Sequence, residues 1–136
     1  MRALPLRRLR EELEAARHGL QAVAAVVAEG REIFDGSLAQ QRALAFCWVS
    51  TGSALKHYAQ LARLAQRQGP LAPAIHFRDR IAHQPLDRLD PASVWKTSVE
   101  DAPKLLRVVE ALIDDLTGEE DLADADVPTG DRDTET

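Results

Sequence analysis

The chain has 136 residues, a length typical of one domain, and 45% of them are apolar although only 4% are aromatic. Alanine, leucine, arginine and glutamate, all strong helix formers, dominate the sequence, which argues against a sheet and predicts a small all-helical protein. The single cysteine, Cys47, excludes an intramolecular disulfide and a thiolate zinc site. We find neither a signal peptide nor an apolar run of the ~20 residues that a membrane span needs, so we expect a cytoplasmic protein without membrane contact.

Charge is unevenly distributed along the chain. The formal net charge is −5, yet residues 114–136 hold ten acidic side chains against one basic one, whereas residues 1–113 hold 16 basic against 12 acidic side chains. A mildly basic body can bind a polyanion, which the net charge of the whole chain would argue against. We therefore predict a helical domain over residues 1–116 and a disordered acidic tail over 117–136. The tail is either inert, or it competes with a polyanion for the basic body or engages a partner protein.

The first half of the sequence predicts two long helices. Apolar residues recur every three or four positions between Leu6 and Val27, which indicates a helix over about 5–29 that ends at Gly30. Ser37 is a plausible N-cap for a second helix over about 37–67. This helix is apolar over a wide arc and has small residues near its middle, so we expect it to lie centrally and to approach another backbone closely.

Three shorter segments follow. A third helix carries APAIHFRDRIAH (72–83) and should end near Pro85. Asp90 is expected to cap the next short helix, with a proline in its first turn, and a last helix should begin near Pro103. Together these segments predict an antiparallel bundle of four to five helices.

The third predicted helix carries a concentration of charged and titratable residues, His76, Arg78, Asp79, Arg80 and His83. Asp79 and His83 are four apart and share a helix face with His76 and Arg80, so the carboxylate could orient the imidazole. Arg78 is five positions before His83, about 140° around an ideal helix, so one straight helix does not bring the two together. The same spacing is equally that of a solvated helix face closed by a histidine.

A catalytic interpretation of these residues requires no metal. An imidazole can move a proton near neutral pH, and an arginine can stabilise charge that develops on a phosphate. RNA supplies its own nucleophile, the ribose 2′-OH, so one base and one cation would suffice for cleavage to a cyclic phosphate. No cysteine or histidine spacing in the chain predicts a metal site, and we expect no cofactor.

The residues that follow the charged helix extend the pattern. An arginine is followed directly by a polar residue and, five positions after the arginine, by a histidine; an Asp-rich loop, a Val-Trp pair and an Asp-x-Pro helix start come next. In this chain these are Arg78, Asp79 and His83, then Asp87 and Asp90, Val94-Trp95, and Asp101-Ala102-Pro103. In this order and spacing the segment from His76 to Ile113 resembles the C-terminal half of the HepT-like proteins, the ribonuclease toxins of the HEPN superfamily.

The resemblance implies a HEPN-like helical homodimer in which two motifs face one composite cleft. It implies a metal-independent endoribonuclease that acts as the toxin of a bacterial toxin–antitoxin system, cleaves RNA, with tRNA as one candidate, and is neutralised by a minimal nucleotidyltransferase antitoxin. By position, His83 would be the general base or acid, Arg78 the phosphate and transition-state stabiliser, and Asp79 the polar orienting residue. Arg80 and His76, on the same helix, are expected to contact RNA.

Two positions depart from the family pattern. Gln84-Pro85 stands where many members have Gly-Tyr, so Pro85 replaces the tyrosine to which the partner attaches AMP, and no AMP acceptor is predicted. Asp79 stands where asparagine is common, which adds a negative charge beside an incoming phosphate. These departures leave a second hypothesis open: a catalytically silent helical binding module that pairs with a nucleotidyltransferase or binds a nucleotide.

Overall fold

The structure is a computed structural model that describes residues 5–126, and every regular element within that range is a helix. In chain order the elements are α1 (Leu6–Ala28), α2 (Arg31–Asp35), α3 (Leu38–Ala62), α4 (Ala72–Ala82), the short 3-10 helix η1 (Leu86–Arg88), α5 (Pro91–Glu100) and α6 (Ala102–Asp126). The predicted all-helical class is confirmed. In this range no helix is both long enough and apolar enough to cross a membrane.

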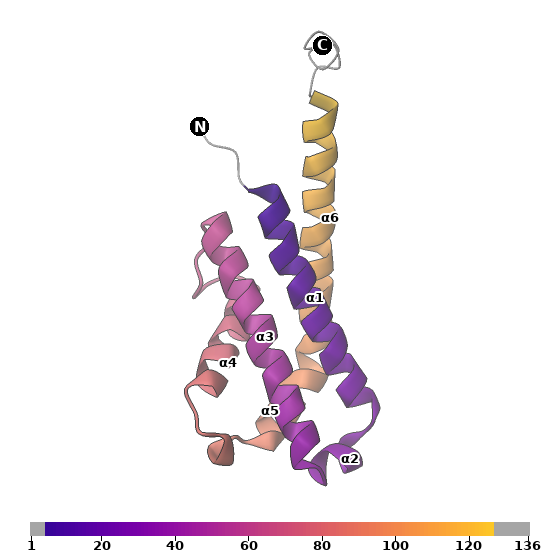
Figure 1. Ribbon diagram of the computed structural model, residues 1–136, viewed down its shortest axis with the longest axis vertical. Helices are drawn as coiled ribbons and strands as arrows, with labels where there is room; N and C mark the ends of the chain where they lie inside the picture. The colour runs from indigo at the N-terminus through magenta and orange to yellow at the C-terminus, as the bar shows by residue number, and fades with distance from the viewer. Residues whose placement is uncertain (1–4, 127–136) are drawn as a thin grey trace.

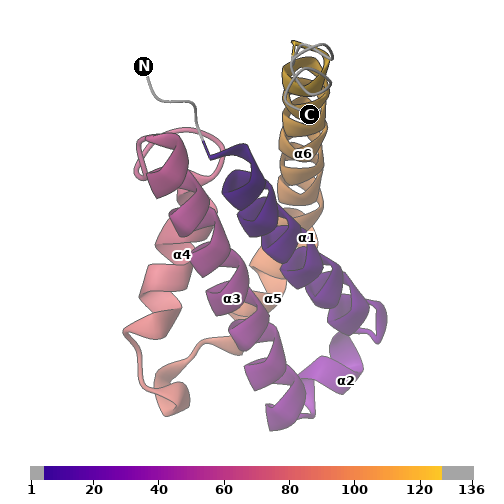
Figure 2. The ribbon, with the colours of Figure 1, turned by 45° about the horizontal axis from the view of Figure 1, so that its top comes forward.

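The longer helices form an up-and-down bundle (Figure 1). Helix α3 packs against α1 on one side and against α4 on the other, and α6 returns beside α1. Successive long helices run in opposite directions, and α6 extends beyond the rest of the bundle, as the tilted view also shows (Figure 2). Helix α4, which carries the charged residues, therefore lies at the outer side of α3.

The predicted apolar faces form the core. Every residue of the α1 seam between Leu9 and Val23 is buried, with 0 to 1% of its surface exposed. The inner face of α3 is equally buried through Leu44, Trp48 and Leu55. Trp48 connects three elements: its Nε1 donates to Ser98 Oγ on α5 at 2.8 Å, and its ring meets Phe77 of α4 edge-on at 5.5 Å. This contact places α4 and α5 around the middle of α3.

Two predicted helix starts are confirmed by their hydrogen bonds. Ser37 Oγ accepts from the backbone N–H of Gln40 at 3.1 Å, and Asp90 Oδ1 accepts from that of Ala92 at 3.1 Å. Each bond satisfies a backbone donor that the first turn of a helix leaves without an intrahelical partner.

The helix α2 was not predicted. It is five residues long, too short to show a periodic pattern, and it occupies the segment before Ser37 that has the composition of a turn. Its Phe34 is buried and packs against Trp95 of α5, with ring centroids 4.9 Å apart. This tertiary contact, rather than local propensity, fixes α2. Gly30 has a positive φ, 99°, and serves as the N-cap of α2.

The second predicted helix is too long at its C-terminal end. Helix α3 stops at Ala62 rather than near residue 67, because Arg63 adopts a left-handed conformation with φ 60°. The backbone N–H of Leu64 then donates to the carbonyl of Ala59 at 2.8 Å, which closes the helix end. The chain can therefore turn back earlier, and residues 63–71 form the connection to α4.

The last helix is longer than predicted. Helix α6 continues to Asp126, so the domain boundary expected at residue 116 falls within it. Arg10 of α1 holds this extension: its Nη1 lies 3.1 Å from Glu120 Oε1 and its Nη2 donates to Thr117 Oγ1 at 2.8 Å. The tail predicted over 117–136 therefore begins as part of α6. Its remainder, residues 127–136, lies outside the described residues.

The close backbone approach predicted for the middle of α3 is found at two glycines. A Cβ built on Gly52 would lie 2.8 Å from Arg78 Cγ and 3.1 Å from the carbonyl oxygen of Ala74, so α4 packs directly on the α3 backbone. On the other side of α3, a Cβ on Gly19 of α1 would lie 3.3 Å from Thr51 Cβ. The absence of a side chain at Gly52 is what sets the spacing between α3 and α4.

We predict opposite effects of two glycine substitutions. Gly52→Ala should destabilise the protein by about 1–3 kcal/mol, since overpacking against Arg78 outweighs the gain in helix propensity. Gly118→Ala, in the exposed extension of α6 with no atom within 4 Å of the new Cβ, should stabilise it by about 0.5–1 kcal/mol. Thermal and urea unfolding of both variants measures the two effects, and equal stabilisation by both would contradict the contact at Gly52.

Candidate functional site

Arg78 lies at the contact between α4 and α3. Its Nε donates to Ser53 Oγ of α3 at 3.0 Å, and its Nη1 donates to Asp79 Oδ1 at 2.9 Å. The side chain retains 27% exposure. Because the stem packs over Gly52 and two hydrogen bonds fix the planar head, the guanidinium is oriented before any ligand arrives and still has N–H groups to offer one.

Asp79 is paired with two cations. Its carboxylate accepts from Arg78 and lies 3.6 Å from Lys56 Nζ on α3. The hydrogen bond from Arg78 lowers the pKa of Asp79, the nearby Lys56 charge acts in the same direction, and partial burial opposes both. Asp79 is therefore a carboxylate at neutral pH, and its charge is shared between Arg78 and Lys56.

His83 ends α4. It is the C-cap residue, its backbone N–H donates to the carbonyl of Asp79 at 3.2 Å, and its side chain is exposed. In the described range the imidazole makes no hydrogen bond to Asp79, whose carboxylate faces Arg78 and Lys56 instead. Asp79 thus orients the arginine, whereas the spacing had suggested that it orients the histidine.

Arg78 and His83 belong to one helix but are not brought together by it. Arg78 is turned toward α3, and His83 stands five residues later at the exposed helix end. The geometric separation expected from the spacing therefore persists in the single chain. Pro85, at the position of the expected tyrosine, follows two residues later and is exposed.

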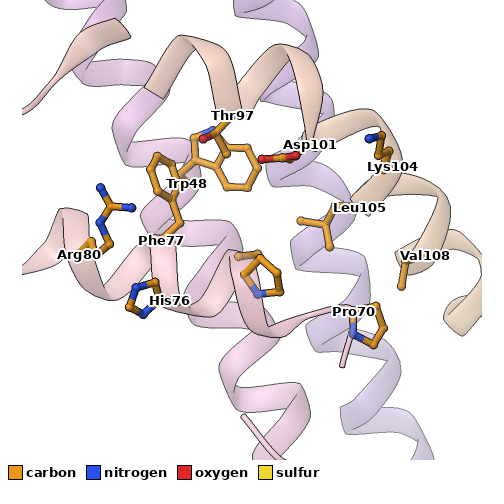
Figure 3. A pocket seen from close by; sticks show the side chains of 12 residues that line it. Trp48, Pro70, His76, Phe77, Arg80, Thr97, Asp101, Lys104, Leu105 and Val108 are labelled. Carbon is orange, nitrogen blue, oxygen red and sulfur yellow. The ribbon is translucent and has the colours of Figure 1, made fainter. Parts of the chain in front are cut away.

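The two residues expected to contact RNA lie on another face of α4. His76 and Arg80 are exposed and line a groove between α4 and the junction of α5 with α6 (Figure 3). The guanidinium of Arg80 lies over the ring of Phe77, 5.8 Å from its centroid. His76 also borders a second hollow of about 800 Å³ on the side of Lys56 and Asp79, which Arg67 lines as well.

Ser53 and Lys56 are site residues that the sequence analysis missed. Both come from α3, 25 and 23 positions before the residues that they contact on α4, so no local spacing connects them. The run of small residues around Gly52 indicated a close backbone approach. It did not indicate that the approaching side chain would be Arg78.

Comparison with known proteins does not extend this description. No family model matches the chain, and no curated protein and no solved structure matches it. Among residues 5–126, no three His, Cys, Asp or Glu side chains gather where they could hold a metal ion. A function for this chain must therefore be inferred from the geometry around Arg78 and His83.

The pairing of Asp79 predicts a pH-dependent contribution to stability. A carboxyl whose pKa is lower in the folded state stabilises the protein above the pKa of the unfolded chain, about 3.9, and loses that contribution as the pH falls through the folded value. Asp79→Asn should therefore lower stability by less than about 1 kcal/mol at pH 7, because the pair is partly exposed.

The difference between wild type and Asp79→Asn should vanish toward pH 2–3. Thermal unfolding of both proteins across pH 7 to 2.5 measures it. Asp87→Asn is the matched control, because the Asp87 carboxylate makes no ion pair within residues 5–126 and its replacement should give no such pH-dependent difference. A constant difference at all pH values would contradict the assigned pairing.

Proposed function

We propose that the chain is a metal-independent endoribonuclease of a bacterial toxin–antitoxin system that acts as a homodimer. The observation that carries the proposal is the Arg78 guanidinium, which is solvent-accessible and is oriented by Ser53 of α3 and by Asp79. Arg78 lies on α4, the helix that ends at the exposed His83. The resemblance of residues 76–113 to the HepT-like proteins supports the same assignment. Lys56 and Arg67, which line the hollow beside Asp79, supply further cations for an RNA backbone.

The proposed reaction uses the nucleophile of the substrate. His83 takes the proton of the ribose 2′-OH, whose oxygen attacks the adjacent phosphorus, and Arg78 donates hydrogen bonds to the phosphorane oxygens as negative charge develops. The bond from phosphorus to the 5′-oxygen then breaks, and the proton that His83 took passes to that oxygen, which restores the neutral imidazole. The products are a 2′,3′-cyclic phosphate and a 5′-hydroxyl end, with no redox change and no co-reactant.

A dimer is part of the proposal because one chain keeps the two residues apart. Arg78 is fixed against α3, whereas His83 stands at the free end of α4. A two-fold axis near α4 would place His83 of one chain beside Arg78 of the other and would create two equivalent sites. The proposed antitoxin is a minimal nucleotidyltransferase; without a tyrosine at position 85, it would act by binding rather than by transfer of AMP to that residue.

We expect His83→Ala to abolish cleavage of total RNA or tRNA and Arg78→Ala to have an equally large effect, since the two act as one unit. His18→Ala is the matched control, because His18 is exposed on α1 and should leave the rate unchanged. The measurement is the rate at which purified protein forms the cyclic phosphate. Circular dichroism checks that each variant is folded. Equal activity of wild type and His83→Ala would remove His83 from the mechanism.

Mixing two inactive variants tests the shared site. The Arg78→Ala and His83→Ala chains are unfolded, mixed in equal amounts and refolded together. If Arg78 of one chain works with His83 of its partner, the mixture should recover about a quarter of the wild-type activity. Half of the dimers are then mixed, and each mixed dimer has one intact site out of two. Each variant refolded alone is the control. No recovery, in a mixture shown to contain mixed dimers, would place both residues in a site within one chain.

A second candidate is a catalytically silent module that pairs with a nucleotidyltransferase or binds a nucleotide. The observation that favours it is the Arg78–Asp79 pair, which places a carboxylate where a phosphate would bind. Production of the chain without a partner discriminates the two functions. A ribonuclease toxin should arrest growth unless His83 is replaced, whereas a silent module should permit growth in both cases.

A further inference from the structure

A groove of about 470 Å³ separates α4 from the junction of α5 and α6. Its inner surface is apolar: Phe77 of α4 and Leu105 of α6 face each other across it, with Trp48 of α3 beneath (Figure 3). Helix α4 has its main packing contact with α3, and within residues 5–126 its contacts with the other helices are marginal by comparison. The volume is in the range of small-molecule pockets, which combine an apolar interior with a few polar groups.

Charged and titratable groups stand at the rim of this groove. His76 and Arg80 come from α4, and Asp101 and Lys104 come from the start of α6 on the opposite side. All four residues are exposed, and Asp101 and Lys104 form no ion pair within residues 5–126. The rim thus offers two permanent cations and one carboxylate around an apolar interior.

We propose that this groove binds one nucleotide of an RNA strand. The base enters between Phe77 and Leu105, the phosphate contacts Arg80 and Lys104, and Asp101 selects bases that carry an exocyclic amino group. That the ligand is RNA rests on the proposed function. The groove and its charged rim are observed independently of that function.

A nucleotide matches the groove because it joins a flat, partly apolar base to an anionic phosphate. The guanidinium of Arg80, held over the ring of Phe77, stands at the rim, where it can bind the phosphate of a nucleotide whose base lies against the apolar interior. A carboxylate accepts hydrogen bonds from the amino groups of adenine, cytosine and guanine, whereas uracil has no such group. Asp101 therefore predicts discrimination against uracil rather than mere attraction of polyanions.

The groove also lies next to the proposed catalytic residue. His76, Arg80 and His83 recur at helical spacing along one side of α4, and His83 follows Arg80 by three residues, about 4.5 Å along the axis. A nucleotide held at Arg80 would direct its neighbour in the strand toward His83. The groove would then choose the base that flanks the cleaved bond.

The test uses 2′-O-methyl oligonucleotides, which lack the nucleophile and cannot be cleaved. Fluorescence anisotropy at low salt with labelled A12, C12 and U12 measures binding by the full chain. We expect A12 and C12 to bind more tightly than U12, and Asp101→Asn to remove the difference, because an amide can also donate to uracil. Within residues 5–126 the Asp101 carboxylate makes no hydrogen bond and no ion pair, so the nearly isosteric asparagine should leave the junction of α5 and α6 unchanged.

A charge reversal separates the groove from the general field of the protein. Lys104→Glu should weaken binding of A12 about tenfold or more, and Arg107→Glu, an exposed residue of the same helix that does not line the groove, should weaken it much less. Equal weakening by both, or an unchanged order of the three oligonucleotides in Asp101→Asn, would overturn the groove assignment. If oligonucleotide binding depends on the groove residues but the chain cleaves no RNA, the groove proposal stands and the ribonuclease proposal is wrong. If the chain cleaves RNA but binding does not depend on the groove residues, the ribonuclease proposal stands and the groove proposal is wrong.

Discussion

The contact of α3 with α4 at Gly52 is the constraint on which the site depends. Helix α4 has its main packing contact with α3, and the missing side chain at Gly52 lets the Arg78 stem lie against the α3 backbone. At that distance Ser53 reaches Nε of Arg78, and Lys56, one turn later on α3, reaches Asp79. One small residue therefore determines both the packing of the motif helix and the orientation of its arginine.

The charge pattern around Asp79 gives this orientation without neutralising the site. The Asp79 carboxylate fixes one nitrogen of Arg78. Asparagine at this position would add no charge, whereas the negative charge of Asp79 is offset by the Lys56 ammonium. The group of three side chains keeps a net charge of one positive unit at neutral pH. Within residues 5–126 the other N–H groups of Arg78 make no hydrogen bond, so the guanidinium can still bind a phosphate, at the cost of some repulsion from Asp79.

The features that were predicted correctly from the sequence are those set by residues close together along the chain. The apolar seam of α1 and the caps Ser37 and Asp90 involve residues within one or two turns of each other, so their spacing was sufficient. The elements it missed depend on distant contacts: α2 is held by Phe34 against Trp95, and the extension of α6 is held by Arg10. The site divides in the same way, because Arg78, Asp79 and His83 were found from their order along α4, whereas their α3 partners were not.

The two proposed catalytic residues differ in how firmly the single chain holds them. Arg78 has a packed stem and two side-chain hydrogen bonds, but His83 has only the backbone bond of a helix end and an exposed ring. Catalysis requires both groups in a defined geometry, so the missing restraint on His83 must come from outside the chain, from a second copy or from the bound RNA. If a second copy supplies this restraint, an isolated chain would bind phosphate through Arg78 and still fail to cleave, and assembly would control activity without any change in the fold of the monomer.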